Sequence, residues 1–425
     1  MALPSLSSLG TISALYLCVE ALGRDPRKAV AMRVLFTCLP FLGHFHPLVP
    51  LARAMEDAGH EVTFATGQTL CPLVVTTGFR ALPMGFDPQG RGWFNLFPHL
   101  LTIPSGPART AWFEGRIFGF MAECAVPDLL RVSEGWRPDV LVREPWEYGG
   151  CVAAERLGVP HATAGVGAFH PPDYAQSLRA PVLNRLRRAL GLPDDPDLAM
   201  LYRYLHLALV PPRFQDPAVP LPPTAHAVRL PLFDRSGTEG LPGWVADLPD
   251  RPTVYATLGT VANALPGVFE AILGGLRDEP VSLIVTVGRD QDPGRFDPQP
   301  ANVHIERYIP QTLLLPRCAV AVSHAGWNTA MACLAHGVPM VLIPFGADMP
   351  ENARRCAALG VARVIAPAEL TAGAIRAAVR DVLSDPEYRR NAERVRDEMV
   401  ALPGPEHAVQ LLERLAVEKQ PLLTA

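Results

Sequence analysis

Residues 323–353 read SHAGWNTAMACLAHGVPMVLIPFGADMPENA, and this stretch decides the fold of the carboxyl half of the chain. It predicts a strand end, a loop containing His324 and Gly326, a helix that begins near Trp327, and then a second buried strand, MVLIPF. The unpaired N–H groups at a helix N-terminus carry about half a positive charge and attract phosphate groups. Further donors at this tip would be the side chains of His324, Asn328 and Thr329. The stretch therefore predicts a diphosphate site.

Three motifs follow one another in this stretch, namely HAGWNT (324–329), GVPMVLIP (337–344) and DMPENA (348–353). A lone histidine-x-glycine would indicate only an ordinary strand, loop and helix. The run of three motifs resembles the donor-binding signature of glycosyltransferase family one. The resemblance covers the chain from Met32 onward. It implies the α/β GT-B fold, in which two Rossmann-like, doubly wound domains face each other across a cleft.

Alternating strand and helix patterns in both halves of the chain also predict parallel, doubly wound sheets. Residues 1–31 precede the first strand, RVLFT, and we expect this extension to be dispensable. Residues 32–210 are expected to form an acceptor-binding domain, and residues 251–405 a nucleotide-sugar-binding domain. Residues 211–250 are rich in proline and predict a linker. The resemblance implies that a helix in residues 406–425 crosses back onto the first domain.

The composition narrows the class of protein. The formal net charge is −4 and basic residues form no run among aromatics, so binding to nucleic acid is not expected. Apolar runs fall short of the roughly twenty residues that cross a bilayer. The eight cysteines are dispersed without a zinc-site spacing and indicate a reducing, cytoplasmic setting. No GxGxxG turn follows the first strand, so a nicotinamide or flavin cofactor is not expected.

His44 is the expected catalytic base. It follows the first strand within GHFHP (43–47), at the sheet edge where open α/β sheets bind ligands. Imidazole, with an ordinary pKa near 6.5, suits removal of a proton from an attacking hydroxyl. The spacing of glycine, histidine and proline also resembles the family's catalytic-histidine motif. His46 falls at a position that varies in the family, and we expect it to line the acceptor pocket.

A carboxylate should fix the tautomer of His44 and stabilise the imidazolium that forms. Glu144 is the candidate, because it follows the strand PDVLVR as the family's aspartate follows its equivalent strand. Glu147 is the alternative carboxylate, and either group could instead pair with Arg143.

An aromatic insertion interrupts the alternation of strands and helices between residues 83 and 120. Such a segment can line an apolar acceptor cleft, or its aromatic residues can fill a small core of their own. Trp93 and Phe94 are the candidates for acceptor binding.

The resemblance assigns the donor site to several strand ends of the second domain. TLGT (257–260) matches the family's turn at the diphosphate, and RYIPQ (307–311) matches its base-binding motif. In that motif, Tyr308 would stack on the nucleobase, Ile309 would offer backbone groups and Gln311 would reach the base or ribose. The full set of donor-binding candidates is Gly259, Thr260, Tyr308, Ile309, Gln311, His324, Gly326, Asn328, Thr329 and Asp348.

Two departures from the family pattern bear on the donor. Ala332 stands where many relatives have a glutamate that binds ribose hydroxyls. Met349 replaces the glutamine that follows the sugar-binding aspartate, Asp348. Both changes favour a less hydroxylated donor, so we expect a dTDP-deoxysugar, with a UDP-sugar as the alternative.

These features predict an inverting glycosyltransferase of antibiotic biosynthesis that moves a sugar to a hydroxyl of a small apolar natural product. Helix amides would meet the charge of the leaving group, so no metal or other cofactor is expected. Asp290-Gln291-Asp292 resembles the manganese-binding DxD motif of another glycosyltransferase fold, but its surroundings favour a solvated loop. The rival functions are a UDP-sugar-dependent macrolide or flavonoid glucosyltransferase, a sugar-nucleotide epimerase and a non-catalytic nucleotide-sugar binder. A homodimer stays an open alternative to a monomer.

Overall fold

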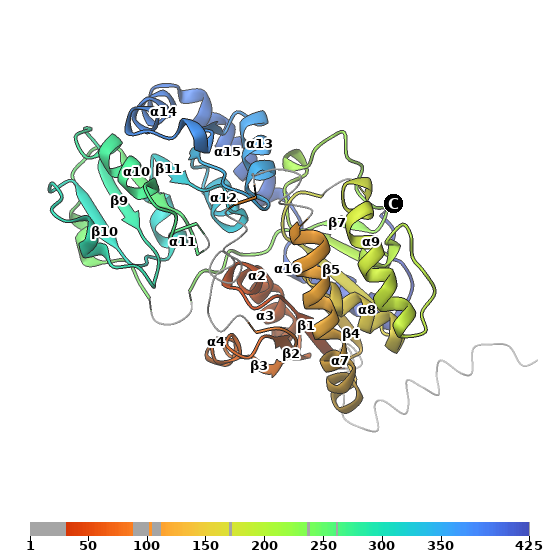
Figure 1. Ribbon diagram of the computed structural model, residues 1–425. Helices are drawn as coiled ribbons and strands as arrows, with labels where there is room; N and C mark the ends of the chain where they lie inside the picture. The colour runs from red at the N-terminus through yellow and green to blue at the C-terminus, as the bar shows by residue number, and fades with distance from the viewer. Residues whose placement is uncertain are drawn as a thin grey trace, which may run out of the picture.

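Two parallel β-sheets, each with helices on both faces, form the two domains of the protein (Figure 1). The predicted pair of Rossmann-like, doubly wound domains is therefore confirmed. The structure is a computed structural model that describes residues 31–87, 102–103, 112–169, 172–235, 239–260 and 262–424, with the backbone alone at 113–115 and 172–177.

The first sheet has seven strands in the order β3-β2-β1-β4-β5-β6-β7, and its neighbouring strands pair in parallel. The strands are β1 (Arg33–Thr37), β2 (Glu61–Thr66), β3 (Arg80–Pro83), β4 (Val140–Arg143), β5 (His161–Gly165), β6 (Leu205–Ala208) and β7 (Ala225–Ala227). The helices between them are α2 (Leu42–Phe45), α3 (Val49–Asp57), α4 (Cys71–Thr76), α7 (Gly119–Trp136), α8 (Tyr148–Leu157) and α9 (Pro172–Ala189).

The second sheet has six strands in the order β10-β9-β8-β11-β12-β13, again in parallel. The strands are β8 (Thr253–Thr257), β9 (Ser282–Thr286), β10 (Val303–Glu306), β11 (Val320–Ser323), β12 (Met340–Leu342) and β13 (Ala362–Val364). The helices of this domain are α10 (Val268–Leu276), α11 (Gln311–Leu314), α12 (Trp327–Ala335), α13 (Met349–Ala358), α14 (Ala372–Ser384) and α15 (Pro386–Ala401), and α16 (Pro405–Glu418) follows them in the chain.

Successive residues of a strand face opposite sides of the sheet, and both sides of these sheets are covered. In β1, Val34 and Phe36 join a core with α3 and α16, whereas Leu35 joins a core with α7 and α8. Because both faces are apolar, such a strand reads as a continuous hydrophobic run rather than an alternating one.

The strand order reverses between β1 and β4 in the first sheet, and between β8 and β11 in the second. At such a switch point the connections leave to opposite faces, and the crevice between them is where ligands bind in open α/β sheets. The segments that follow β1 and β4 carry His44 and Glu144, and the segments that follow β8 and β11 carry Gly259 and His324. The topology thus gathers the predicted residues at two crevices.

The structure shortens the linker that was expected over residues 211–250. Strand β7 lies inside this range as the edge strand of the first sheet, and Val228 is fully buried in the first domain. Phe214 is also buried, but in the second domain, where its ring meets that of Trp327 edge to face. The proline-rich segment conceals β7, because three residues are too short to show a strand pattern.

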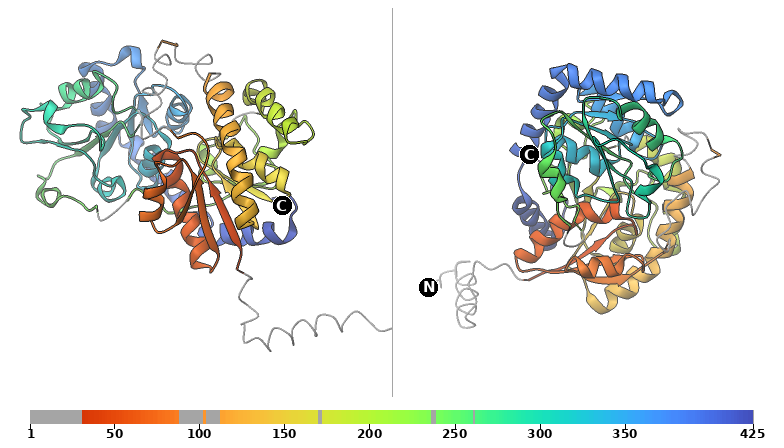
Figure 2. Two further views of the ribbon diagram at one scale, coloured as in Figure 1. Left: turned by 60° about the horizontal axis from the view of Figure 1, so that its bottom comes forward. Right: turned by 90° about the vertical axis from the view of Figure 1, so that its left-hand side faces the viewer.

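The chain crosses between the domains twice. After α15 it returns to the first domain, where α16 packs on α3 and fills the core beneath the first sheet (Figure 2). The backbone N–H of Arg229, on the first crossing, donates to the carbonyl of Pro403, on the second, at 2.7 Å. The two crossings therefore lie side by side.

Trp93 and Phe94, together with residues 1–30 of the expected extension, lie outside the described residues. The end of the aromatic insertion is helical, because a π-helical segment, Phe113–Phe118, continues into α7. Phe118 is buried against Tyr148 and belongs to the domain core. Within the part of the chain that the structure describes, no helix is long and apolar enough to cross a membrane.

Arg355, on α13, fastens the segment after β6 to the second domain. Its guanidinium is buried and donates to three successive carbonyl groups. The neighbouring Arg354 is instead about half exposed and pairs with the carboxylate of Asp216. The carbonyl oxygens that accept from Arg355 are those of Arg213 (3.2 Å), Phe214 (2.7 Å) and Gln215 (2.8 Å).

Replacing Arg355 with Met is expected to lower the free energy of unfolding by roughly 2–4 kcal/mol, because buried carbonyls lose their donors. Arg354→Met, one residue away, removes an exposed ion pair and should change it by less than about 1 kcal/mol. Urea denaturation of both variants beside the wild type measures the difference. Equal effects of the two substitutions would contradict a fastening role for Arg355.

Candidate active site

His44 and Glu144 are in contact at the first switch point. His44 lies in α2, the first helix after β1, and Glu144 directly follows β4. The His44 Nδ1 and Glu144 Oε1 atoms are 3.1 Å apart, an ion-pair distance, although the ring is turned out of hydrogen-bond geometry. The histidine side chain is 19% exposed, whereas the glutamate side chain is fully buried. The imidazole can therefore meet a ligand from the cleft while the carboxylate stays behind it.

Glu144 is held in place by the backbone. Its Oε1 accepts from the amide of Leu39 at 3.3 Å, and its Oε2 accepts from the amide of Trp146 at 2.8 Å. These bonds come from the two loops of the switch point, so the carboxylate has a fixed position next to His44.

Glu147, the alternative partner, has a different task. It caps the start of α8 by accepting from the Gly150 amide at 2.9 Å, and it accepts from the hydroxyl of Thr37 at 2.5 Å. Burial raises the pKa of Glu147 to about 7, against the opposing effect of these hydrogen bonds and of Arg143. The structure thus brings Glu144, and not Glu147, against His44.

Arg143 is fully buried directly before Glu144. Neither glutamate carboxylate pairs with its guanidinium, which donates to backbone carbonyls instead. Three of these carbonyls belong to the turn that carries Glu144, so Arg143 braces that turn from within. The accepting oxygens are those of Glu144 (3.0 Å), Pro145 (3.0 Å), Glu147 (3.3 Å) and Leu201 (2.9 Å).

At the second switch point, His324 packs on the turn after β8. A Cβ atom at Gly259 would lie 2.6 Å from Cε1 of His324, and the φ angle of Gly259 is 62°, so glycine is required there. Burial lowers the pKa of His324 to about 4, so the imidazole is neutral and offers one N–H without a charge. Thr260 follows this turn and is exposed.

Helix α12 begins at Trp327 as the sequence predicts, and its N-cap, Gly326, provides no side-chain cap. The first-turn amides are therefore free of a capping side chain, and Asn328 and Thr329 lie in the same turn. The Asn328 Nδ2 atom donates to the carbonyl of Gly43 in the first domain at 3.3 Å. This bond brings the tip of α12 to α2, the short helix that carries His44.

The motifs HAGWNT and DMPENA meet through Asn352, which is buried in α13. Its Nδ2 atom donates to the carbonyl of Ala325 at 3.0 Å and to the carboxylate of Asp348 at 2.8 Å. Ala325 has a left-handed φ angle of 65°, which is uncommon for a residue with a side chain. The bond to Asn352 supports this turn and fixes the position of His324 relative to Asp348.

A pocket between the domains extends from the tip of α12. Gln311 and Asn328 provide polar groups in it, whereas Met331 and Ala332 make one wall apolar. Pro47 of the first domain and Phe233 of the linker complete the enclosure. The apolar wall includes the position at which many members of the resembling family have a glutamate.

Tyr308 already has one face of its ring covered. The guanidinium of Arg289 lies 3.8 Å from the ring centroid, and the tyrosine hydroxyl donates to the Asp234 carbonyl. A nucleobase would therefore have to stack on the opposite face. Ile309 is buried in the domain core, so its side chain cannot face a ligand.

His46 lies on the linker side of the cleft. Its ring meets that of Phe233 edge to face at 5.3 Å. Burial lowers the pKa of His46 to about 4, with a smaller effect from Arg289 of the second domain. The structure thus places this residue toward the linker and the second domain, away from the side of His44 that holds Glu144.

The Asp290-Gln291-Asp292 segment forms a surface loop. The carboxylate of Asp292 caps the 3₁₀ turn Pro293–Phe296 by accepting from the Gly294 amide at 3.3 Å. Arg307 lies 3.7 Å from the same carboxylate. Asp292 therefore has a local structural role.

The sequence alone did not indicate the cavity that lies beside the His44–Glu144 pair. Trp146 lines it, and its indole meets the imidazole of His44 edge to face at 5.6 Å. The place of Trp146 in the sequence could have identified it, because it follows Glu144 by two residues at a strand end. Phe169, Tyr202 and His206 also line the cavity, but they lie in segments without a motif.

Comparison with known proteins agrees with this geometry. Residues 108–259 match the N-terminal domain of the erythromycin biosynthesis protein CIII-like family, and residues 271–415 match its C-terminal domain. The chain is 30% identical over 435 residues to tylactone mycaminosyltransferase of Streptomyces fradiae, which covers 92% of this chain and 94% of that protein. It is 32% identical over 421 residues to 4'-demethylrebeccamycin synthase of Lentzea aerocolonigenes, covering 90% of this chain and 99% of that protein.

Solved structures show the same relationship. The glycosyltransferase VinC in complex with dTDP superposes with a TM-score of 0.76 and 27% identity, covering 91% of this chain and all of VinC. The glycosyltransferase SnogD from Streptomyces nogalater superposes with a TM-score of 0.71 and 27% identity over the same shares of both chains. The chain therefore belongs to the erythromycin biosynthesis protein CIII-like family, and it is a GT-B natural-product glycosyltransferase of glycosyltransferase family one that uses nucleotide-sugar donors.

Proposed function

We propose that this glycosyltransferase moves a deoxysugar from a dTDP donor to a hydroxyl of a small natural product, with inversion at the anomeric carbon and without a metal ion. The observation that carries the proposal is the contact between His44 and Glu144 beside the uncapped tip of α12. Displacement of a nucleoside diphosphate requires a base for the acceptor and stabilisation of the departing anion. The crevice of the first sheet supplies the base, and the crevice of the second sheet supplies the site for the anion.

His44 acts as the base in this proposal. Its Nδ1 atom faces Glu144, so its Nε2 atom takes the proton of the acceptor hydroxyl as the oxygen attacks the anomeric carbon. The bond between that carbon and the diphosphate oxygen breaks as the new glycosidic bond forms, and one displacement inverts the configuration. The carboxylate of Glu144 stabilises the imidazolium that results.

The tip of α12 receives the leaving diphosphate. Its first-turn amides and the side chains of Asn328 and Thr329 are in place before the reaction, so little reorganisation is needed as charge develops. His324 adds a neutral N–H donor. In this mechanism fixed dipoles take the role that a metal ion has in other glycosyltransferases.

The wall formed by Met331 and Ala332 supports a thymidine donor. Alanine cannot bind the ribose 2′-hydroxyl, which uridine nucleotides carry and thymidine nucleotides lack. The complex of VinC with dTDP is consistent with this choice. Met349, buried directly after Asp348, offers a thioether where an amide would bind sugar hydroxyls, which favours a deoxysugar.

A UDP-sugar donor is the alternative within the same chemistry. A sugar-nucleotide epimerase and a non-catalytic nucleotide-sugar binder are the alternatives outside it. The pair of His44 and Glu144 disfavours a mere binder, which needs no base.

Replacing His44 with Ala is expected to lower kcat about 10²- to 10⁴-fold, because the acceptor proton loses its base. Glu144→Gln should lower kcat on the order of 10²-fold, and Glu147→Gln much less, since Glu147 caps α8. Chromatography of glycoside formed from a dTDP-deoxysugar and an acceptor that the wild type uses gives the rates. Binding of dTDP by thermal shift is the control and should persist. Equal losses in the two glutamine variants would remove Glu144 as the specific partner.

The buried carboxyl of Glu147 predicts a pH dependence of stability. Its pKa is about 7 in the folded protein and near 4.3 for an exposed glutamate, so the folded state holds the proton more tightly between these values. Stability should therefore fall as pH rises from about 4.5 to 7, by about 3 kcal/mol from this group. Glu147→Gln should lack this decrease. The difference in unfolding midpoint between the variant and the wild type should therefore shift in favour of the variant from pH 5 to pH 8. Parallel pH profiles for the two proteins would refute the assignment.

The donor proposal predicts that dTDP raises the unfolding temperature of the wild type more than UDP does at equal concentration. Ala332→Glu should shift the ratio of affinities toward UDP about fivefold, the effect of one hydrogen bond to ribose. Ala358→Glu, which adds the same charge at an exposed position of α13, is the control and should leave the ratio unchanged. Faster turnover of UDP-glucose than of any dTDP-deoxyhexose, with one acceptor, would rule out the proposed donor.

A further inference from the structure

The chain crossing that leaves the first sheet after β7 reaches the base-binding motif of the second domain. Phe233, on this crossing, packs on the core of the first domain, and the guanidinium of Arg53 in α3 lies 4.7 Å from its ring centroid. The next residue, Asp234, is 7% exposed and forms its hydrogen bonds with the second domain. Two successive residues thus connect the domains at the pocket between them, which both residues line.

Both carboxylate oxygens of Asp234 accept hydrogen bonds from Thr312, the second residue of α11. The backbone amide of Thr312 donates to Oδ2 at 2.8 Å, and its hydroxyl donates to Oδ1 at 2.8 Å. Amides in the first turn of a helix have no intrahelical acceptor, and a side chain at the N-cap usually accepts from one of them. Pro310 is at the N-cap of α11 and provides no side-chain acceptor. Asp234 therefore caps α11 from another part of the chain.

The backbone of Asp234 holds the other end of the motif. Its carbonyl accepts from the hydroxyl of Tyr308. Burial first, and then the carboxylate of Asp234, raise the pKa of Tyr308 to about 12, so the hydroxyl keeps the proton that it donates. Tyr308 and Thr312 lie on either side of residues 309–311. One residue of the crossing therefore holds the base-binding motif at both of its ends.

A second acidic residue of the same crossing acts on the ring of Tyr308. Glu239 accepts from the guanidinium of Arg289 at 2.6 Å, and this guanidinium covers one face of the tyrosine ring. The side chains of Arg289 and Glu239 are 41% and 24% exposed, so their ion pair contributes less than the buried bonds of Asp234. The crossing thus affects both the position of the ring and the face that it offers to a nucleobase.

We infer that Asp234 is a positioning residue for donor recognition, and that it holds residues 308–312 in the conformation that binds the nucleoside of the donor. The inference rests on the proposed function, with Tyr308 and Gln311 at that nucleoside. The carboxylate borders the pocket between the domains, but both of its oxygens accept from Thr312, so Asp234 acts through the motif rather than on the ligand. A binding segment that is ordered in advance loses less entropy when the ligand arrives.

Two parts of the second domain receive the two parts of the donor. In the proposed reaction the tip of α12 receives the diphosphate, and residues 308–312 receive the nucleoside. Inorganic pyrophosphate uses only the first of these sites, whereas dTDP uses both. The ratio of the two affinities therefore measures how well the nucleoside is bound, and a general loss of stability does not change this ratio.

Asp234→Ala is expected to weaken binding of dTDP about tenfold and binding of pyrophosphate less than about twofold, because only the nucleoside contacts lose their support. Asp234→Asn should keep the ratio within about twofold of the wild type, since its amide oxygen accepts from the Thr312 amide while its amide nitrogen donates to the Thr312 hydroxyl. Titration calorimetry of the full chain gives the affinity for dTDP, and displacement of dTDP by pyrophosphate gives the second affinity.

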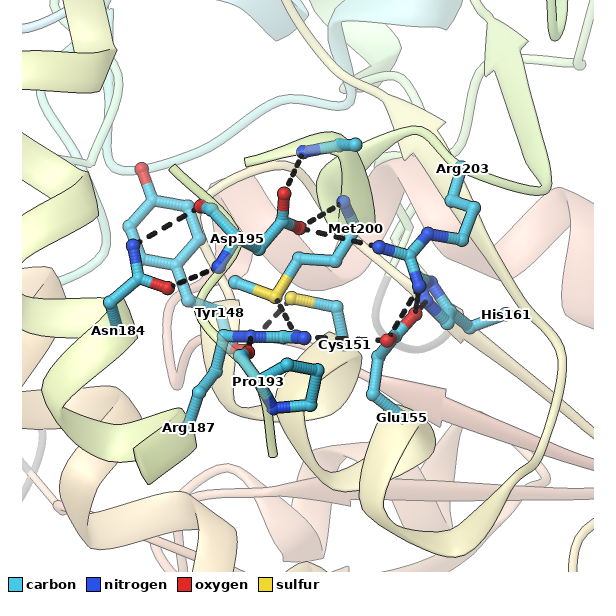
Figure 3. A network of polar contacts seen from close by, with 11 residues as sticks. Tyr148, Cys151, Glu155, His161, Asn184, Arg187, Pro193, Asp195, Met200 and Arg203 are labelled. Carbon is cyan, nitrogen blue, oxygen red and sulfur yellow. Dashed lines mark hydrogen bonds and ion pairs between the residues drawn. The ribbon is translucent and has the colours of Figure 1, made fainter. Parts of the chain in front are cut away.

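Asp195, in the first domain, provides a matched control. It is also 7% exposed and also caps a short helical turn, because its carboxylate accepts from the amides of Ala199 and Met200. It belongs to the buried polar network in Figure 3, which joins α8, α9 and the segment before β6. Asp195→Ala should therefore lower the unfolding temperature, as Asp234→Ala does, but keep the wild-type ratio of affinities.

A second variant separates action through Thr312 from direct contact of Asp234 with the donor. Thr312→Val loses only the hydroxyl bond and should weaken binding of dTDP about threefold, whereas Thr312→Ser keeps the hydroxyl and the affinity. In the Asp234→Ala background Thr312→Val should have almost no effect, because the partner of the hydroxyl is already gone. Thr312→Val leaves the bond from the backbone amide to Asp234 intact, so it decides the question even if Asp234→Ala does not fold.

Four results would each overturn the inference. They are an unchanged ratio of affinities in Asp234→Ala, a loss in Asp234→Asn as large as in Asp234→Ala, an unchanged dTDP affinity in Thr312→Val, and full additivity of the Thr312→Val and Asp234→Ala effects. A wild type that binds dTDP no more tightly than pyrophosphate would remove the nucleoside site itself, and with it both the proposed donor and the inference. Failure of the proposed function is therefore distinguishable from failure of the role of Asp234 alone.

Discussion

The hydrogen bond from Asn328 to the carbonyl of Gly43 joins the switch points of the two sheets, and the active site depends on it. A single Rossmann-like domain has one crevice, which can offer a base or an anion site but not the two facing each other. Here α2, which carries His44, and the tip of α12 come from different domains and touch. In the proposed reaction the anomeric carbon lies between them, so the packing of the two domains would set the distance between the base and the site of the leaving group.

The first crevice also concentrates ionisable groups in the buried interior of the domain. Arg143, Glu144 and Glu147 are all buried, and two of them are acids next to one another in the same turn. The two acids have different partners. Glu144 contacts His44, whereas Glu147 contacts Thr37 and the start of α8. Arg143 binds carbonyls rather than either carboxylate, so it provides rigidity and a positive potential without neutralising a single partner.

The fold and the donor loops were predictable because strands buried on both faces give continuous apolar runs and because the loop motifs are local in sequence. His44 and Glu144 could be chosen as candidates for the same reason, since each lies in the segment that follows a strand. Strand β7 was not, because three residues show no pattern. The role of Arg143 and the cavity lined by Tyr202 and His206 were also inaccessible, because they arise from contacts between segments that the topology alone brings together.

The two chain crossings between the domains lie side by side and are joined by the bond from Arg229 to Pro403. A paired joint of this kind behaves like a strap hinge: it bends readily across its width but resists twisting about its length. The two domains can therefore shift against each other in fewer ways than two domains on a single linker could. This restriction helps to keep the tip of α12 in register with the segment that carries His44.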